Sequence, residues 1–198
     1  MRRIPRLLLD MDDVLADFIG GVCDLYGVTY RQAVAEWTPG AWGLWRPVAL
    51  AAGRPELTEG DFWASLDRKE GFWAGLEPLP WFKEMVRLAD EEADEWIILS
   101  AGTWCPSSRA GKEAWCRRHL GWDRREVHER LCTFPQKHMF ATRGTVLVDD
   151  KESAVVKFII EGGNGIVFPR HHNGLHRHQA DPLGHVCEIL GREPGAVH

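Results

Sequence analysis

The stretch that decides the fold is Leu7-Leu8-Leu9-Asp10-Met11-Asp12-Asp13-Val14-Leu15-Ala16-Asp17-Phe18, in which an apolar run ends abruptly in acidic residues. Three adjacent leucines without polar alternation predict a strand buried on both faces. Asp10 then lies at the carboxyl end of that strand, which is the edge where open α/β sheets bind ligands.

A second acidic cluster, Asp149-Asp150, follows another apolar run, Thr145 to Val148. Two such clusters at strand ends indicate a Mg²⁺ site, because small hard cations prefer carboxylate oxygens as ligands. The alternative is that Asp10 and Asp12 form a solvated turn that caps the next helix. The repetition of the pattern at Asp149-Asp150 favours the metal site.

The composition is that of a globular protein with one core and room for a small insertion. The chain has 198 residues, of which 44% are hydrophobic and 27% charged. A net charge of −5 argues against extensive non-specific binding to nucleic acid. The five cysteines show no paired spacing and are expected to be free thiols of a reducing compartment.

The sequence contains no apolar run long enough to span a membrane. The nine residues before Asp10 are predicted to build the first strand, so we expect no targeting segment among them. We therefore expect a cytoplasmic protein without a membrane partner.

Strands and helices alternate along the chain. Strands are predicted at residues 4–9, 96–99, 131–134, 145–148 and 165–168. Helices are predicted at residues 14–26, 30–37, 44–53, 59–66, 81–92, 108–119, 123–130, 152–160 and 182–190. This order predicts an α/β fold with a parallel sheet covered by helices on both faces. Residues 28–76 are expected to form a small helical cap, and residues 1–27 and 77–198 the core domain.

The chain resembles the haloacid-dehalogenase superfamily of phosphatases, and within it the 5′(3′)-deoxyribonucleotidases. The resemblance rests on the acidic stretch quoted above, on Leu76-Glu77-Pro78-Leu79-Pro80 and on Leu147-Val148-Asp149-Asp150, with a weaker match at His172-Asn173 and His176. It implies a three-layer Rossmann-like fold with the small cap inserted after the first strand and helix.

The resemblance also implies catalytic roles. Asp10 would be the nucleophile that forms an aspartyl-phosphate, and Asp12 the general acid and then the general base. Mg²⁺ would be bound by Asp10, by the backbone carbonyl of Asp12 and by the Asp149-Asp150 pair, and would reduce the repulsion between carboxylate and phosphate.

The expected phosphate-binding groups are the Ser100 hydroxyl and the backbone N–H groups near Ala101 and Gly102. The family often has Thr-Ser-Pro here, so the hydroxyl of the second position is absent from this chain. Lys112 is expected to pair with the nucleophile and the phosphoryl group, and Lys137 is its rival. The alternative for either lysine is a position on the surface.

Substrate choice is expected to depend on aromatic residues that could stack on a base. The candidates are Phe18, Trp42, Trp45 and Trp63, and the alternative is that they form the core of the cap. His171, His172, His176 and His178 have a spacing that could bind a transition metal, but a solvated loop is the preferred interpretation.

The sequence thus predicts a Mg²⁺-dependent phosphatase that hydrolyses nucleoside monophosphates, with deoxyribonucleoside 5′-monophosphates as the favoured substrates. One alternative is a phosphatase for another small phosphomonoester, such as a sugar phosphate, or for a nucleic-acid 3′-phosphate. A catalytically silent binding module is a third interpretation, which the intact acidic residues disfavour. The resemblance is compatible with a homodimer.

Overall fold

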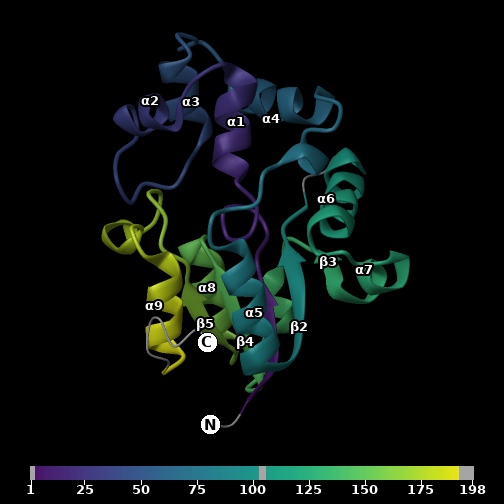
Figure 1. The fold of residues 1–198 in the computed structure, drawn as a ribbon. Coiled ribbons are helices and arrows are strands. Elements are labelled where there is room, and N and C mark those ends of the chain that lie inside the picture. The colour runs from purple at the N-terminus through teal and green to yellow at the C-terminus, as the bar shows by residue number, and fades with distance from the viewer. Residues whose placement is uncertain (1–2, 103–105, 192–198) are drawn as a thin grey trace.

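The computed structural model describes residues 3–102 and 106–191, and its centre is a five-stranded parallel sheet (Figure 1). The strands are β1 (Ile4–Leu9), β2 (Ala93–Ser100), β3 (Leu131–Thr133), β4 (Thr145–Asp149) and β5 (Asn164–Val167), in the order β3-β2-β1-β4-β5. β1 is the central strand, and its leucines are buried because both faces of the sheet are covered there. The predicted α/β fold is confirmed.

Side chains of the central strands alternate between two separate cores. Leu7 and Leu9 belong to the larger core, to which α5 (Phe82–Glu92), α6 (Pro106–His119) and α9 (Pro182–Ile189) contribute. Leu8 belongs to the smaller core, to which α8 (Glu152–Ile160) contributes Phe158. This alternation is the period of two that every strand imposes, and it produces the three layers that were expected.

The first helix, α1 (Phe18–Tyr26), begins later than the predicted start at Val14. The residues before it pair with a distant segment instead. The N–H of Asp17 donates to the Glu77 carbonyl at 2.8 Å, and the N–H of Leu79 donates to the Leu15 carbonyl at 2.9 Å. The Asp17 side chain then caps α1 by accepting from the Gly20 N–H. Tertiary hydrogen bonds therefore override the helical pattern of residues 14–17.

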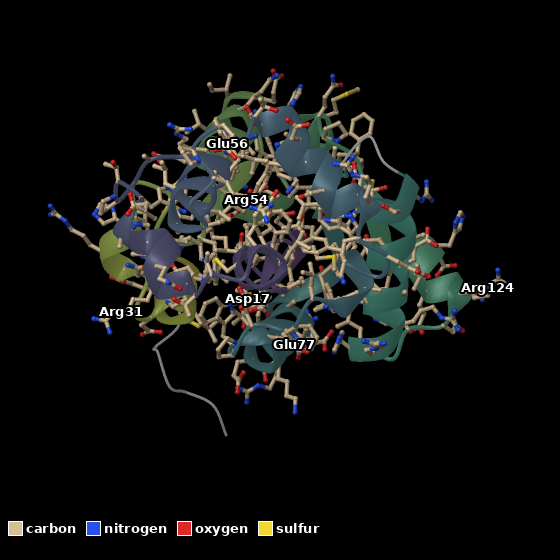
Figure 2. All side chains as sticks on the ribbon, turned by 90° about the horizontal axis from the view of Figure 1, so that it is seen from above. Asp17, Arg31, Arg54, Glu56, Glu77 and Arg124 are labelled. Atoms are coloured by element: carbon tan, nitrogen blue, oxygen red, sulfur yellow. The ribbon has the colours of Figure 1, made fainter. Side chains whose placement is uncertain are left out.

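Helices α2 (Tyr30–Ala35), α3 (Trp45–Ala51) and α4 (Glu59–Arg68) lie above the carboxyl ends of the strands (Figure 1). Helix α1 contacts α2 and α3. Asp17 and Glu77, close together in Figure 2, mark where the chain enters and leaves this region. The division into a core of residues 1–27 and 77–198 and a cap of residues 28–76 stays a prediction, and α1 packs against the helices of that cap.

The remaining short elements are η1 (Trp73–Gly75), α7 (Arg124–Arg130), η2 (Lys137–Phe140) and η3 (His176–His178). Elsewhere, strands and helices lie within a few residues of the predicted bounds. Within residues 3–102 and 106–191, none of the helices combines the length and apolar character needed to cross a membrane.

We expect Leu8→Ala to lower the free energy of unfolding by about 2–5 kcal/mol, since it leaves a cavity in the middle layer of a packed structure. The measurement is equilibrium unfolding in urea followed by circular dichroism. Val156→Ala is the matched control, because Val156 is 48% exposed on α8 and its truncation should change stability by less than about 0.5 kcal/mol. Equal losses in the two variants would contradict the two-core description.

Candidate active site

The strand register brings the acidic clusters to one edge of the sheet. Leu9 of β1 lies opposite Val148 of β4 and Ile98 of β2. The N–H of Asp10 continues the ladder by donating to the Val148 carbonyl at 2.9 Å. Ser100 ends β2 at the same edge, with Ala101 and Gly102 directly after it.

The turn after Asp10 is tight and contains one residue in a left-handed conformation. Asp13 has φ 57°, which is unusual for a residue other than glycine. The N–H groups of Leu15 and Ala16 both donate to the Met11 carbonyl at 2.9 Å. The buried Asp13 carboxylate accepts a hydrogen bond from the Ile19 N–H and lies 3.5 Å from the Arg170 guanidinium. Asp13 therefore stabilises the loop that carries Asp10 and Asp12.

The lysine that contacts Asp10 is Lys137. Its Nζ lies 2.7 Å from Asp10 Oδ1 and 2.6 Å from Asp149 Oδ2. It extends from η2 and is 4% exposed, so the surface interpretation of this lysine is wrong. Burial alone would lower the pKa of Lys137, but Asp10 and Asp149 raise it above its ordinary value.

Lys112 contacts the other acid of the loop. Its Nζ donates to Asp12 Oδ2 at 2.5 Å and to Ser100 Oγ at 2.7 Å. The expected pairing of Lys112 with Asp10 is therefore replaced by a pairing with Asp12, because α6 crosses the sheet edge on the β2 side. Gly111 allows the close approach of α6, since a Cβ there would lie 2.4 Å from the Cβ of Trp73.

The four acids differ in their access to solvent. The Asp12 side chain is 22% exposed, whereas that of Asp149 is 1% exposed. Burial raises the pKa of Asp12, and the Lys112 ammonium opposes this effect. Asp12 is therefore the most exposed of the four acids, although its Oδ1 is buried and its Oδ2 pairs with Lys112.

Asp10, Asp149 and Asp150 form a group that could hold a metal ion. One carboxylate oxygen of each residue lies within 4.8 Å of the others. Burial, against the opposing effect of Lys137, raises the pKa of Asp149 to about 7; burial and the nearby Asp10 raise that of Asp150 to about 8. Among the described residues, Asp10 Oδ1 faces only Lys137 Nζ, at 2.7 Å. Crowded, desolvated carboxylate oxygens of this kind fit a small divalent cation.

The four candidate aromatic residues lie in different places. Phe18 is 8% exposed and stacks with Trp63 at 6.1 Å and with Trp73 at 5.4 Å between ring centroids, so its ring is poorly placed to receive a base. Trp63 is therefore the outer member of a stack whose inner member, Trp73, lies 5.1 Å from Lys112 Nζ. The sequence analysis did not select Trp73.

Trp42 is the aromatic candidate next to the acids. It is 57% exposed, and the Nζ of Lys151, the residue after Asp150, lies 5.2 Å from its ring centroid. Trp45 is half-buried in α3, and its ring faces the Arg46 guanidinium at 5.7 Å. Trp42 is therefore the best placed of the four to meet a molecule held at the acids.

The histidines after β5 do not form a solvated loop throughout. His171 and His172 are buried, and His172 Nε2 lies 2.6 Å from Asp150 Oδ2. Within residues 3–102 and 106–191, the only group of metal-ligating side chains is the acidic one, so the four histidines do not converge. The weak sequence match at His172-Asn173 was the available signal for this contact.

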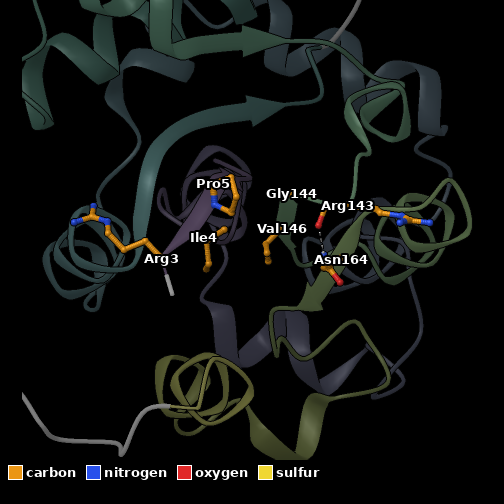
Figure 3. A pocket seen from close by; sticks show the side chains of 7 residues that line it. All are labelled: Arg3, Ile4, Pro5, Arg143, Gly144, Val146 and Asn164. Atoms are coloured by element: carbon orange, nitrogen blue, oxygen red, sulfur yellow. Dashed lines mark hydrogen bonds between the residues drawn. The ribbon is translucent and has the colours of Figure 1, made fainter. Parts of the chain in front are cut away.

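A separate cavity lies at the opposite, amino edge of the sheet (Figure 3). Its volume is about 480 Å³, and it is lined by Arg3, Ile4, Pro5, Arg143, Gly144, Val146 and Asn164. The guanidinium groups of Arg3 and Arg143 point away from its centre in Figure 3, and Arg3 pairs with Asp94 at 3.2 Å. The cavity holds none of the acids described above, and we assign no chemistry to it.

Comparisons with solved structures identify the fold. The chain is similar to a haloacid dehalogenase-like hydrolase from Xanthomonas campestris, with a TM-score of 0.53 and 13% identity over 96% of this chain and 92% of that one. It is equally similar to a hydrolase of the same superfamily from Deinococcus radiodurans, described with bound phosphate and sodium, with a TM-score of 0.53 and 17% identity over 98% and 100%. The haloacid dehalogenase fold is therefore confirmed.

Comparisons of sequence identify the family. The chain is 30% identical over 157 residues to the human cytosolic 5′(3′)-deoxyribonucleotidase, which covers 77% of this chain and 74% of the relative. It is 30% identical over 128 residues to the mouse mitochondrial 5′(3′)-deoxyribonucleotidase, which covers 61% and 55%. The family model described as "5′ nucleotidase, deoxy (Pyrimidine), cytosolic type C protein" matches residues 2–184. The chain is therefore a phosphoric monoester hydrolase that belongs to this family of nucleotidases.

Proposed function

We propose that this enzyme hydrolyses deoxyribonucleoside 5′-monophosphates with Mg²⁺ through an aspartyl-phosphate on Asp10. The observation that carries the proposal is the pair of buried lysine contacts. Lys137 joins Asp10 to Asp149, and Lys112 joins Asp12 to Ser100. These contacts give the two acids of one loop different cationic partners, and the side chain of Asp12 is more exposed than that of Asp10.

The first chemical step would use Asp10 and Asp12. A carboxylate oxygen of Asp10 attacks phosphorus, the bond from phosphorus to the ester oxygen breaks, and Asp12 gives its proton to the leaving alkoxide. The raised pKa of Asp12 favours the protonated form that this role needs. In the second step Asp12 takes a proton from water, which attacks phosphorus and releases phosphate and the Asp10 carboxylate.

The neighbouring groups would position the phosphate. Mg²⁺, held by Asp10, Asp149, Asp150 and the Asp12 carbonyl, would supply positive charge at the phosphoryl oxygens when bound. The Ser100 hydroxyl, Lys112 Nζ and the backbone N–H groups of Ala101 and Gly102 would bind these oxygens from the β2 side. Lys137 would hold Asp10 in place and reduce its repulsion with Asp149.

Substrate preference and location complete the proposal. The relatives named above support a nucleotide, and the exposed Trp42 offers a surface for its base. A cytoplasmic location stays a prediction, since one relative is named cytosolic and another mitochondrial. The homodimer and the lack of a nucleic-acid partner also stay predictions.

The direct test is phosphate release from deoxyribonucleotides, ribonucleotides, sugar phosphates and 3′-phosphorylated oligonucleotides, with Mg²⁺ or with EDTA. We expect the highest kcat/KM on a deoxyribonucleoside monophosphate, and loss of activity with EDTA that added Mg²⁺ restores. A higher kcat/KM on sugar phosphates or oligonucleotide ends would overturn the proposed substrate. Full activity in EDTA would overturn the metal requirement.

We expect Asp10→Asn to lower kcat by more than about 10³-fold, since an amide cannot act as the nucleophile. The measurement is phosphate release at saturating Mg²⁺. Asp17→Asn is the matched control, because Asp17 caps α1 and has no proposed chemical role. Substantial turnover by Asp10→Asn, with an unchanged circular dichroism spectrum, would place the nucleophile elsewhere.

We expect Lys137→Met to lower the free energy of unfolding by about 3–5 kcal/mol in EDTA, since it leaves two buried carboxylates without their cation. Added Mg²⁺ should recover part of this loss. The measurement is urea unfolding in EDTA and in Mg²⁺. Lys83→Met, at an exposed position of α5, is the control and should be close to wild type in both conditions. A loss that Mg²⁺ does not change would argue against a metal between Asp10 and Asp149.

We expect Trp42→Ala to lower kcat/KM for the best nucleotide by about tenfold, because stacking on a base is worth about 1–3 kcal/mol. At saturating Mg²⁺, hydrolysis of p-nitrophenyl phosphate should change much less. Trp45→Ala is the control, since the Trp45 ring faces Arg46. Equal losses on both substrates would show that Trp42 supports the site without contacting the base.

A further inference from the structure

His172 is a buried residue for which the proposed reaction has no role. It lies in the loop after β5, is 3% exposed, and its Nε2 lies 2.6 Å from Asp150 Oδ2. The next residue, Asn173, contacts the main chain of Asp150. Its Nδ2 donates to the Asp150 carbonyl and to the Phe168 carbonyl, both at 2.8 Å. Two consecutive residues of this loop thus hold Asp150, one by its side chain and one by its main chain.

The ring of His172 is fixed by two tryptophans from the segment between α2 and α3. Trp37 stacks on it at 5.6 Å and 20° between the ring planes, and Trp42 meets it edge to face at 5.1 Å and 85°. The neighbouring residue joins the same two segments. His171 Nε2 lies 3.2 Å from the Trp37 carbonyl, and the His171 carbonyl accepts from the Gly40 N–H at 2.8 Å.

The second ring nitrogen of His172 shows which contact orients the residue. Nδ1 is buried and has no hydrogen-bond partner among residues 3–102 and 106–191. Asp13 and Arg170, whose charges also act on this ring, pair with each other. The contact with Asp150 is therefore the polar interaction that sets the ring, while the tryptophans supply the packing. Burying an unpaired nitrogen is unfavourable, so the orientation toward Asp150 must provide an offsetting gain.

We propose that His172 is a positioning residue that holds the Asp150 carboxylate in the orientation needed for Mg²⁺, and that Trp37 and Trp42 hold His172. A carboxylate ligand rotates freely unless a second group fixes it, and outer-shell partners of this kind are worth about 10–100-fold in metal affinity. The proposal rests on the Mg²⁺ site of the proposed function. It adds that residues 37–42, far from the acids in sequence, contribute to metal binding.

The test is a titration of the whole chain with Mg²⁺ in the absence of substrate. Binding is measured as the rise in thermal unfolding temperature with Mg²⁺ concentration. Mn²⁺ binding followed by electron paramagnetic resonance is the second readout. We expect His172→Phe, which keeps an aromatic ring but loses Nε2, to weaken metal binding by about tenfold or more. His172→Gln can still donate to Asp150 and should retain affinity closer to wild type.

His171→Phe is the matched control, because His171 is also buried but contacts the Trp37 carbonyl and no acid. It should bind Mg²⁺ within about threefold of wild type. At saturating Mg²⁺, kcat of His172→Phe should approach that of wild type, which a residue in contact with substrate would not allow. If His172→Phe does not fold, the comparison of His172→Gln with His172→Ala replaces it.

Three outcomes would overturn the proposal: wild-type affinity in His172→Phe, an equal loss in His171→Phe, or no binding of Mg²⁺ or Mn²⁺ to the wild-type chain. Because no nucleotide is used, the result is independent of the substrate. A chain whose Mg²⁺ affinity depends on His172 but which does not hydrolyse deoxyribonucleotides would support this inference and contradict the proposed function.

Discussion

The structure depends on holding several carboxylates close together in a poorly solvated place. Asp10, Asp149 and Asp150 gather at the edge of the sheet because the register of β1 and β4 admits no other arrangement. Lys137 reduces the repulsion between these carboxylates, since its ammonium lies within 2.7 Å of Asp10 and Asp149. Without such a cation, each buried charge would cost several kcal/mol of stability. A site of this kind is therefore strained electrostatically and ready to accept further positive charge.

Lys137 and Lys112 each pair with a different acid of the loop after β1. Asp10 and Asp12 are two residues apart, yet Lys137 reaches one from the β4 side and Lys112 reaches the other from the β2 side. The different roles that we propose for these acids then follow from their surroundings, because the two side chains are chemically identical. Asp13, in the same loop, has a third environment beside Arg170 and serves the shape of the turn.

The sequence predicted the features that depend on local pattern. The leucines of β1 and the apolar run of β4 were sufficient for the buried strands. Thr29 and Thr58, which directly precede two of the predicted helices, cap α2 and α4. The sequence-based prediction failed where contacts with a distant segment determine the local structure. Residues 14–17 have a helical pattern, but the Glu77 carbonyl takes the Asp17 N–H. Lys112 and Lys137 could not be assigned to their partners, because the paths of α6 and η2 across the edge are not encoded locally. The weak match at His172-Asn173 marked this segment, but it did not identify Asp150 as the partner of His172.

The pairing of residues 15–17 with residues 77–79 has a consequence for how such a chain could diversify. The two connections run side by side, joined by hydrogen bonds from Asp17 and Leu79. The residues between these two connections leave the sheet and return to it where the connections are hydrogen-bonded to each other. Insertions, deletions or exchanged sequence in that interval would not shift the register of β1 against β2, and Asp10 would keep its place. The intervening segment can therefore vary without displacing Asp10, provided that Trp37 and Trp42 keep their contacts with His172 beside Asp150.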